Sequence, residues 1–247
     1  MFDTAALAAI AGTFLLAGTV KGVIGLGLPT VSLGLLAVAL DLTTAMALLL
    51  APSFVTNLWQ ALVGGNAVAL LRRLWPFLAL AAATVWLGAL ALTRVDVAFL
   101  SALLGVLLVL YGGVSLAGVR FTVDPRAQAW TGPVLGTVNG VLTGMTGSFV
   151  VPGVMYLQSI GLPRDMLIQA MGMLFTVSTL SLGVALHGNH LLVTEQAAVS
   201  AVAVLPAIAG MVIGQRIRSR LSEQAFRKAF FGALLALGGY IVVRALV

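Results

Sequence analysis

Residues 18–30 have the sequence GTVKGVIGLGLPT. This stretch lies inside an apolar run, yet it contains four glycines, one lysine and one proline. Glycine weakens a helix and permits backbone conformations that other residues avoid, whereas proline is well tolerated in the first turn of a new helix. The sequence therefore predicts that one helix ends within this stretch and that another begins near Pro29.

The composition indicates a membrane protein. Of the 247 residues, 61% are hydrophobic and 8% are charged, whereas about 25% of the residues of a soluble domain are charged. The mean hydropathy is +1.13. The formal net charge of +6 comes from basic residues between apolar segments, so it indicates membrane orientation and not a nucleic-acid surface. The chain has no cysteine, which excludes disulfides, thiolate metal sites and thiol catalysis.

Ten apolar segments follow one another along the chain, five in each half. Because a spanning helix needs about 20 residues, the segments 28–40, 129–143 and 149–161 are short and predict half-helices of two re-entrant hairpins. Irregular backbone at membrane depth persists only where protein or a water-lined cavity satisfies its polar groups, so such breaks predict a site. The expected fold is an all-α polytopic membrane protein. Its ten segments are 5–24, 28–40, 43–63, 74–93, 97–118, 129–143, 149–161, 166–187, 196–215 and 225–246.

A repeated motif divides the chain into two membrane repeats, 1–118 and 129–247, which are joined by the linker 119–128 and form one integral membrane domain. GTVKGV at residues 18–23 returns as GTVNGV at 136–141, an offset of 118. Later glycine pairs recur at offsets of 123 to 126. Because each half has an odd number of segments, we expect the second repeat to be inverted in the bilayer.

Basic residues in the connections predict the same inversion. Loop 64–73 ends in Arg72-Arg73, whereas its counterpart 188–195 contains no Lys or Arg. Loop 216–228 contains five basic residues, whereas its counterpart 94–96 contains one. The positive-inside rule then places loops 64–73 and 216–228 inside and both termini outside. Alternatively, a basic loop serves only to bind anionic lipid, which would leave the repeat unaffected.

The distribution of charge favours an anionic ligand. All seven acidic residues fall at a terminus or in a predicted connection, whereas Lys21 lies beside the first break. A charge within the membrane is costly unless it faces a cavity or a partner, and the start of each half-helix adds partial positive charge and unpaired N–H groups. We therefore expect the two breaks to hold a small oxyanion. Two structural alternatives stay open: Lys21 reaches the headgroups, or the glycines and hydroxyls serve only helix packing.

The candidate ligand-binding residues lie at the two breaks or are polar residues in nearby apolar segments. For Asn57 and Gln169, interhelical hydrogen bonding is an alternative role. No metal site is expected, because the two histidines of the chain have no third ligand. No cofactor is expected either, since Walker and dinucleotide motifs are missing, and convergent acids or histidines for an enzyme are missing as well. The candidates are Lys21, Gly22, Gly25, Gly27, Pro29, Thr30, Asn57, Asn139, Gly140, Thr143, Gly144, Thr146, Gly147, Ser148, Pro152 and Gln169.

The paired breaks resemble those of the TauE/SafE family of sulfite and organosulfonate exporters. The first motif is GVIGLGLP at 22–29, the second is GVLTGMTGSFVVP at 140–152, and a GLPRD turn follows at 161–165. The resemblance covers essentially the whole chain. It implies a multi-pass carrier of the bacterial inner membrane, surrounded by lipid, with inverted repeats and a small sulfur-containing anion as its substrate.

The function expected from these features is a secondary transporter that alternates access to an anion site. An anion channel and a membrane scaffold without flux are the alternatives. No acidic residue is available within the membrane for a proton relay, so passive flow or coupling through another group is expected. The sequence leaves open the exact substrate, the direction of transport and the oligomeric state, a homo-oligomer included.

Overall fold

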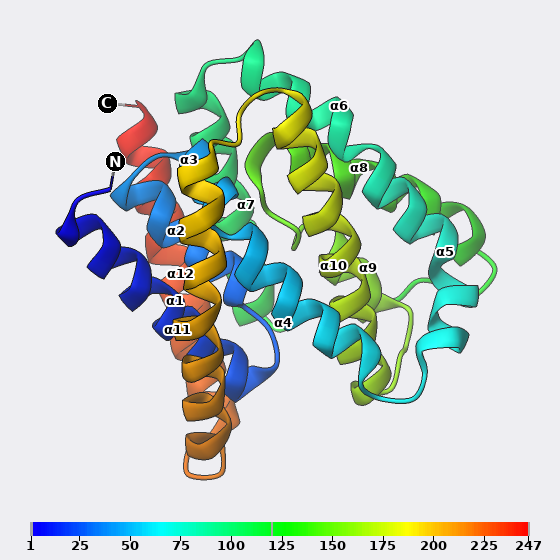
Figure 1. Ribbon diagram of the computed structural model, residues 1–247. Helices are drawn as coiled ribbons and strands as arrows, with labels where there is room; N and C mark the ends of the chain where they lie inside the picture. Colours follow the sequence, from blue (N-terminus) through cyan, green and yellow to red (C-terminus); the bar gives the residue numbers. More distant parts are fainter. Residues whose placement is uncertain (1, 120, 247) are drawn as a thin grey trace. The chain divides into compact units, whose positions relative to one another are not determined.

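The computed structural model describes residues 2–119 and 121–246 and consists, over these residues, of helices without any strand. This confirms the predicted all-α fold (Figure 1). The elements are α1 (Thr4–Ile24), α2 (Leu28–Ala39), α3 (Leu42–Leu48), α4 (Leu50–Leu62), α5 (Ala67–Ala83), α6 (Val85–Ala89), the 3-10 helix η1 (Leu90–Thr93), α7 (Val97–Leu116), α8 (Gln128–Thr146), α9 (Gly153–Ser159), α10 (Arg164–Gly188), α11 (Thr194–Arg218) and α12 (Glu223–Leu246).

Several of these helices are long and apolar enough to cross a membrane. Within the described residues there are six such segments, and α3 with α4, bent by 46°, gives a seventh if the pair forms one span. These spans confirm a multi-pass membrane protein. Helices α2 and α9 are short, as predicted, with 12 and 7 residues. Helix α8 is not short, because it continues to Thr146 and has 19 residues.

Two helix boundaries correct the predicted loops. Helix α5 begins at Ala67, so Arg72 and Arg73 lie in the helix and not in a loop. The Arg73 guanidinium donates hydrogen bonds to Gln128 Oε1 at 2.9 Å and to the Ile160 carbonyl at 3.0 Å. Helix α11 likewise extends to Arg218, because basic side chains are favourable at the negative end of a helix dipole. The segment predicted from hydropathy began after Arg73 in the first case and ended before Arg216 in the second.

The chain forms two compact units, and each takes helices from both halves of the sequence. Unit 1 comprises the described residues of Met1–Pro52, Asp96–Gly118 and Leu192–Val247. Unit 2 comprises Ser53–Val95 and the described residues of Val119–Leu191. Helices α1, α2, α3, α7, α11 and α12 therefore belong to unit 1, and α5, α6, α8, α9 and α10 belong to unit 2 together with most of α4.

Glycines bring the helices of unit 1 into backbone contact. Gly18 and Gly22 of α1 face the backbone of α11, and Gly210 and Gly214 of α11 face the backbone of α1 in return. Small residues at such positions let membrane helices approach closely. The contacting residues have increasing numbers along both helices in the same direction, so α1 and α11 run parallel.

Helices α7 and α12 of unit 1 pack in the opposite sense. A Cβ atom on Gly105 would lie 2.7 Å from the Gly238 carbonyl, and a Cβ atom on Gly112 would lie 2.9 Å from the Phe231 carbonyl. The pair is therefore antiparallel. At the repeat offset of 126, Gly105 corresponds to Phe231 and Gly112 corresponds to Gly238. The contact between Gly105 and Gly238 is therefore equivalent by the repeat to the contact between Phe231 and Gly112. This geometry agrees with the predicted inversion.

In unit 2, α8 packs on α5 and α6 through the same kind of contact. A Cβ atom on Gly136 would lie 2.5 Å from the Phe77 carbonyl oxygen of α5. Gly140 and Gly144 face the backbone of Ala81 and Val85, one and two helical turns further along. Helix α8 therefore runs parallel to α5, as α1 does to α11. The aromatic rings of Phe77 and Tyr156, whose centroids are 4.9 Å apart, join α5 to α9.

The two breaks have the same backbone structure, but the structure aligns them at a different offset from the one at which the sequence motif recurs. Gly25 ends α1 with φ +81° and donates its N–H to the Lys21 carbonyl at 2.8 Å. Gly147 ends α8 with φ +74° and donates its N–H to the Thr143 carbonyl at 2.7 Å. The structural offset is thus 122, so Lys21 corresponds to Thr143 and not to Asn139. Because glycine recurs at every fourth residue of α8, Gly18 and Gly22 also align with Gly140 and Gly144, one helical turn away from the sequence match.

Candidate functional sites at the two helix breaks

The first break lies in unit 1 between α1 and α2. Two of its glycines have backbone angles that favour glycine: Gly25 with φ +81° and Gly27 with φ +106°. A side chain on Gly27 would also press against Val20 and Phe230, at 3.1 and 3.2 Å. Glycine is therefore required here by conformation and by space. The break falls where the sequence predicts it, between Ile24 and Leu28.

Lys21 lies in the last turn of α1, just before this break. Its side chain is only 4% exposed, so it is buried and does not extend along the outer surface. Its carbonyl accepts the N–H of the capping Gly25. The last turn of a helix carries partial negative charge, which is a favourable environment for a cation.

Helix α2 begins immediately after the break with a buried first turn. Pro29 lies within its first two positions, and its N-cap, Gly27, provides no side-chain hydrogen bond. Pro29 and Thr30 are both buried. The Ser32 hydroxyl donates to the carbonyls of Leu28 and Pro29, at 2.7 and 3.2 Å. The positive end of the α2 dipole is therefore buried and has no capping side chain.

The second break lies in unit 2 between α8 and α9. It begins at Gly147 and ends at Pro152, the N-cap of α9. Asn139 Oδ1 accepts the N–H of Gly153 at 2.9 Å, which ties the first residue of α9 to the middle of α8. The Thr143 hydroxyl donates to the Ser148 carbonyl at 3.0 Å, which fixes the start of the irregular segment.

The polar side chains at this second break differ in whether they are already hydrogen-bonded. The hydroxyls of Thr143 and Thr146 donate to the backbone, the latter to Leu142 at 2.7 Å. The Thr146 hydroxyl also accepts the N–H of Ser148. By contrast, Asn139 Nδ2 and Ser148 Oγ have no hydrogen-bond partner among the described residues. Asn139 and Ser148 therefore have polar atoms available for a ligand.

Gln169 and Asn57 belong to unit 2, and both side chains are buried. Gln169 Nε2 donates to the Ala61 carbonyl at 2.9 Å, and its Oε1 accepts the N–H of Asn66 at 3.1 Å. Both ends of its amide thus hold the connection between α4 and α5. Asn57 lies in α4 and is 0% exposed.

Three of the candidate glycines contact neighbouring helices. Gly22 faces α11, Gly140 faces Ala81 and Thr84 of the α5–α6 region, and Gly144 faces Val85. The absence of a side chain permits close helix packing at each of these positions.

One polar residue that the sequence analysis did not select belongs with the second break. Ser178 of α10 is 0% exposed, and its hydroxyl has no hydrogen-bond partner among the described residues. It follows Leu174 and Phe175 by one helical turn, and these two residues contact Gly153 and Phe149 respectively. A serine inside a long apolar helix is the only signal that the sequence gives for it.

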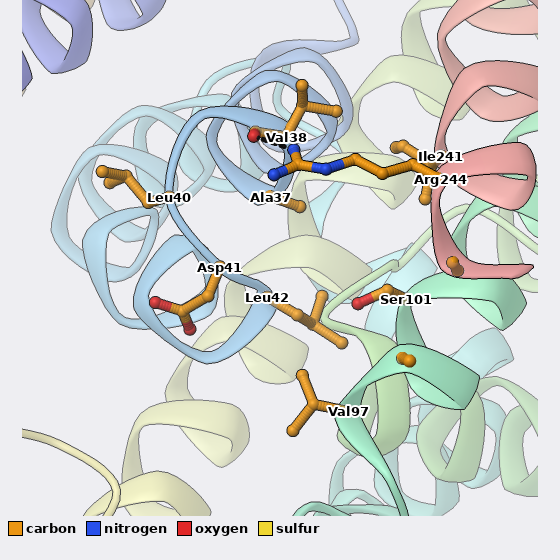
Figure 2. A pocket seen from close by; sticks show the side chains of 11 residues that line it. Ala37, Val38, Leu40, Asp41, Leu42, Val97, Ser101, Ile241 and Arg244 are labelled. Atoms are coloured by element: carbon orange, nitrogen blue, oxygen red, sulfur yellow. Dashed lines mark hydrogen bonds between the residues drawn. The ribbon is translucent and has the colours of Figure 1, made fainter. Parts of the chain in front are cut away.

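A separate pocket of about 210 Å³ lies at one end of unit 1 (Figure 2). It is lined by the end of α2, the starts of α3 and α7, and the end of α12. Its charged side chains stabilise helix ends: the Arg244 guanidinium donates to the Val38 carbonyl of α2, and Asp41 Oδ1 accepts the N–H of Thr44 in α3. The pocket includes neither break.

Acidic residues in the described structure lie at helix starts and in connections, as predicted. The side chains of Asp3, Asp41 and Asp96 accept N–H groups in the first turns of α1, α3 and α7. Within the described residues, no group of three His, Asp or Glu residues could hold a metal ion.

Comparison with known families identifies the chain. The family model described as sulfite exporter TauE/SafE matches residues 10–241, which include both breaks. Searches of the curated proteins and of the solved structures found no match. The family model covers nearly the whole chain, and the structure is that of a multi-pass helical membrane protein. The chain belongs to the TauE/SafE family of sulfite exporters.

Proposed function

We propose that this protein is a secondary carrier that exports small sulfur-containing oxyanions, such as sulfite or organosulfonates, by alternating access. Membership of the TauE/SafE family supports transport of this class of anion. The bacterial inner membrane is the location that the family resemblance implies. The protein is a transporter and not an enzyme, and lipid surrounds its spanning helices.

The observation that carries the proposal is the presence of two helix breaks with buried, electropositive or hydrogen-bond-donating surroundings. At the first break, the buried Lys21 and the uncapped start of α2 favour negative charge. At the second break, Asn139 and Ser148 have unpartnered polar atoms among the described residues. In transporters, discontinuous helices of this kind form substrate sites.

Coupling does not involve a carboxylate within the spanning helices. Five acidic residues lie at the first residues of helices or immediately before them, and the other two, Asp124 and Asp165, lie in a connection and in the first turn of α10. None of them occupies the middle of a helix. The carrier therefore moves the anion down its own gradient or couples its movement through a group other than a carboxylate.

Lys21 provides the direct test. The Lys21→Ala variant, purified and reconstituted in proteoliposomes, should raise the KM for sulfite at least tenfold, because a buried cation opposite an anion contributes about 1.5–3 kcal/mol as a charge-assisted hydrogen bond. The Lys21→Arg variant should retain part of the affinity. Lys228→Ala, which removes a positive charge near the start of α12, is the matched control and should change the KM by less than twofold. A folded Lys21→Ala variant with an unchanged KM would remove Lys21 from the site.

A further inference from the structure

Three buried polar side chains of unit 2 with unpartnered atoms lie in elements at or next to the second break. Asn139 lies in α8, Ser148 lies in the irregular segment, and Ser178 lies in α10. Their exposed fractions are 0%, 3% and 0%. Asn139 Nδ2, Ser148 Oγ and Ser178 Oγ each have no hydrogen-bond partner among the described residues. A buried polar group without a partner is unfavourable by itself, so three such groups near one break indicate a ligand.

Contacts within unit 2 bring the three elements together. Asn139 is joined to the start of α9 by its hydrogen bond with Gly153. A Cβ atom on Gly153 would lie 2.8 Å from Leu174 of α10, and Ser178 lies one turn beyond Leu174 on the same face of that helix. Next to Ser148, the ring of Phe149 lies 5.9 Å from that of Phe175. All three side chains therefore border the space around the start of α9.

The orientation of the Asn139 amide defines the chemistry of this site. Its oxygen already accepts the Gly153 N–H, so the group left for a ligand is the NH₂ donor. Serine hydroxyls can donate as well. Residues 127–163 contain no Asp, Glu, Lys, Arg or His. The donors at this break are therefore uncharged, in contrast to the lysine at the first break.

We infer that Asn139, Ser148 and Ser178 form a binding subsite in which uncharged donors hold the oxygen atoms of the transported oxyanion. This inference rests on the proposed function and adds the residues that recognise the substrate at the second break. Asn139 has two roles: its oxygen positions α9, and its NH₂ group binds the anion. Uncharged donors bind an anion less tightly than a buried cation does, which suits a carrier that must release its substrate.

The Asn139→Asp variant separates the two roles of this residue. An aspartate oxygen still accepts the Gly153 N–H, while the donor that faces the ligand becomes a negatively charged acceptor. We expect sulfite binding, measured by isothermal titration calorimetry on the purified protein in detergent, to weaken at least tenfold. The thermal midpoint of the ligand-free protein should stay close to that of the wild type.

Serine variants test the same subsite without introducing a charge. Ser148→Ala and Ser178→Ala should each weaken sulfite binding by about threefold to tenfold, the range expected for one hydrogen bond. Ser159→Ala is the matched control: this serine is also buried in unit 2, but its hydroxyl donates to the Tyr156 carbonyl at 2.7 Å. The control should change sulfite affinity by less than twofold.

The outcomes distinguish the subsite from the proposed function. If the wild type binds and transports sulfite, and Ser148→Ala, Ser178→Ala and Asn139→Asp bind it as the wild type does, the subsite is refuted while the transport function stands. If the wild type neither binds nor transports sulfite, sulfate or an organosulfonate, both proposals are wrong. Weakened binding in all three variants supports the subsite if the Ser159→Ala control is unchanged and the thermal midpoint of Asn139→Asp stays close to that of the wild type. If Asn139→Asp lowers the thermal midpoint, the two serine variants decide.

Discussion

Gly238 and Gly239 are neighbours in α12 that should respond in opposite ways to alanine. A Cβ atom on Gly238 would lie 2.7 Å from the Gly105 carbonyl oxygen, which is 0.7 Å inside the 3.4 Å at which ordinary contact begins. The same atom would lie 2.9 Å from Leu108 Cβ. The opposing atoms belong to backbone or to a Cβ, so they cannot rotate away. Helices α7 and α12 must therefore separate.

The size of the effect follows from this overlap. Overpacking of a well-packed interface costs about 1–3 kcal/mol, so Gly238→Ala should lower the free energy of unfolding by about that amount. At Gly239, no atom lies within 4 Å of the added carbon. Gly239→Ala should therefore have no steric cost and gains up to about 1 kcal/mol in helix propensity.

The assay is unfolding by sodium dodecyl sulfate in mixed micelles, followed by circular dichroism, together with the thermal midpoint in detergent. The account predicts a difference of about 2 kcal/mol or more between the two variants, which combines the overpacking cost with the propensity gain. Equal stability of the two variants, or a more stable Gly238→Ala, would show that α7 and α12 do not pack through Gly105 and Gly238.

Two further predictions concern Gln169 and the orientation of the chain. Gln169→Leu removes hydrogen bonds to Ala61 and Asn66 and should lower the free energy of unfolding by about 1–3 kcal/mol, with sulfite affinity unchanged; lower affinity at unchanged stability would contradict this structural role. Because the chain has no cysteine, single variants can be labelled without background: in cells, a membrane-impermeant maleimide should label His190→Cys from outside, and should label Ser222→Cys only after permeabilisation. Labelling of both positions from the same side would refute the predicted crossing of the membrane by α11 and the orientation derived from the basic loops.

Most of the fold could be predicted because helix breaks and spans are local properties. Glycines and a proline in an apolar run determine where α1 ends and where α2 begins. The ends of α5, α8 and α11 could not be predicted from hydropathy, because arginines and hydroxyl residues continue a helix when their side chains find partners. Arg73 reaches Gln128 and Ile160, and Thr146 bonds back to Leu142.

The candidate site was less predictable than the fold, because residue type does not reveal which hydrogen bonds are already made. Thr143, Ser148 and Gln169 are equally polar in the sequence. In the structure, Thr143 and Gln169 are bonded to the backbone, whereas the Ser148 hydroxyl has no partner among the described residues. Ser178 was missed because it lies far from both motifs in sequence. The register of the repeat was also ambiguous, since glycine at every fourth residue allows two alignments.

Counterflow of labelled sulfite in proteoliposomes distinguishes a carrier that alternates access from a channel and from a protein without flux. The wild-type protein is reconstituted, the vesicles are loaded with unlabelled sulfite or with buffer alone, and the initial uptake of labelled sulfite is measured. A carrier that alternates access predicts faster uptake into the sulfite-loaded vesicles, and predicts that Lys21→Ala and Asn139→Asp lose most of this acceleration. Uptake that is independent of the internal sulfite would indicate a channel, and the absence of any protein-dependent uptake of sulfite or organosulfonates would contradict transport itself.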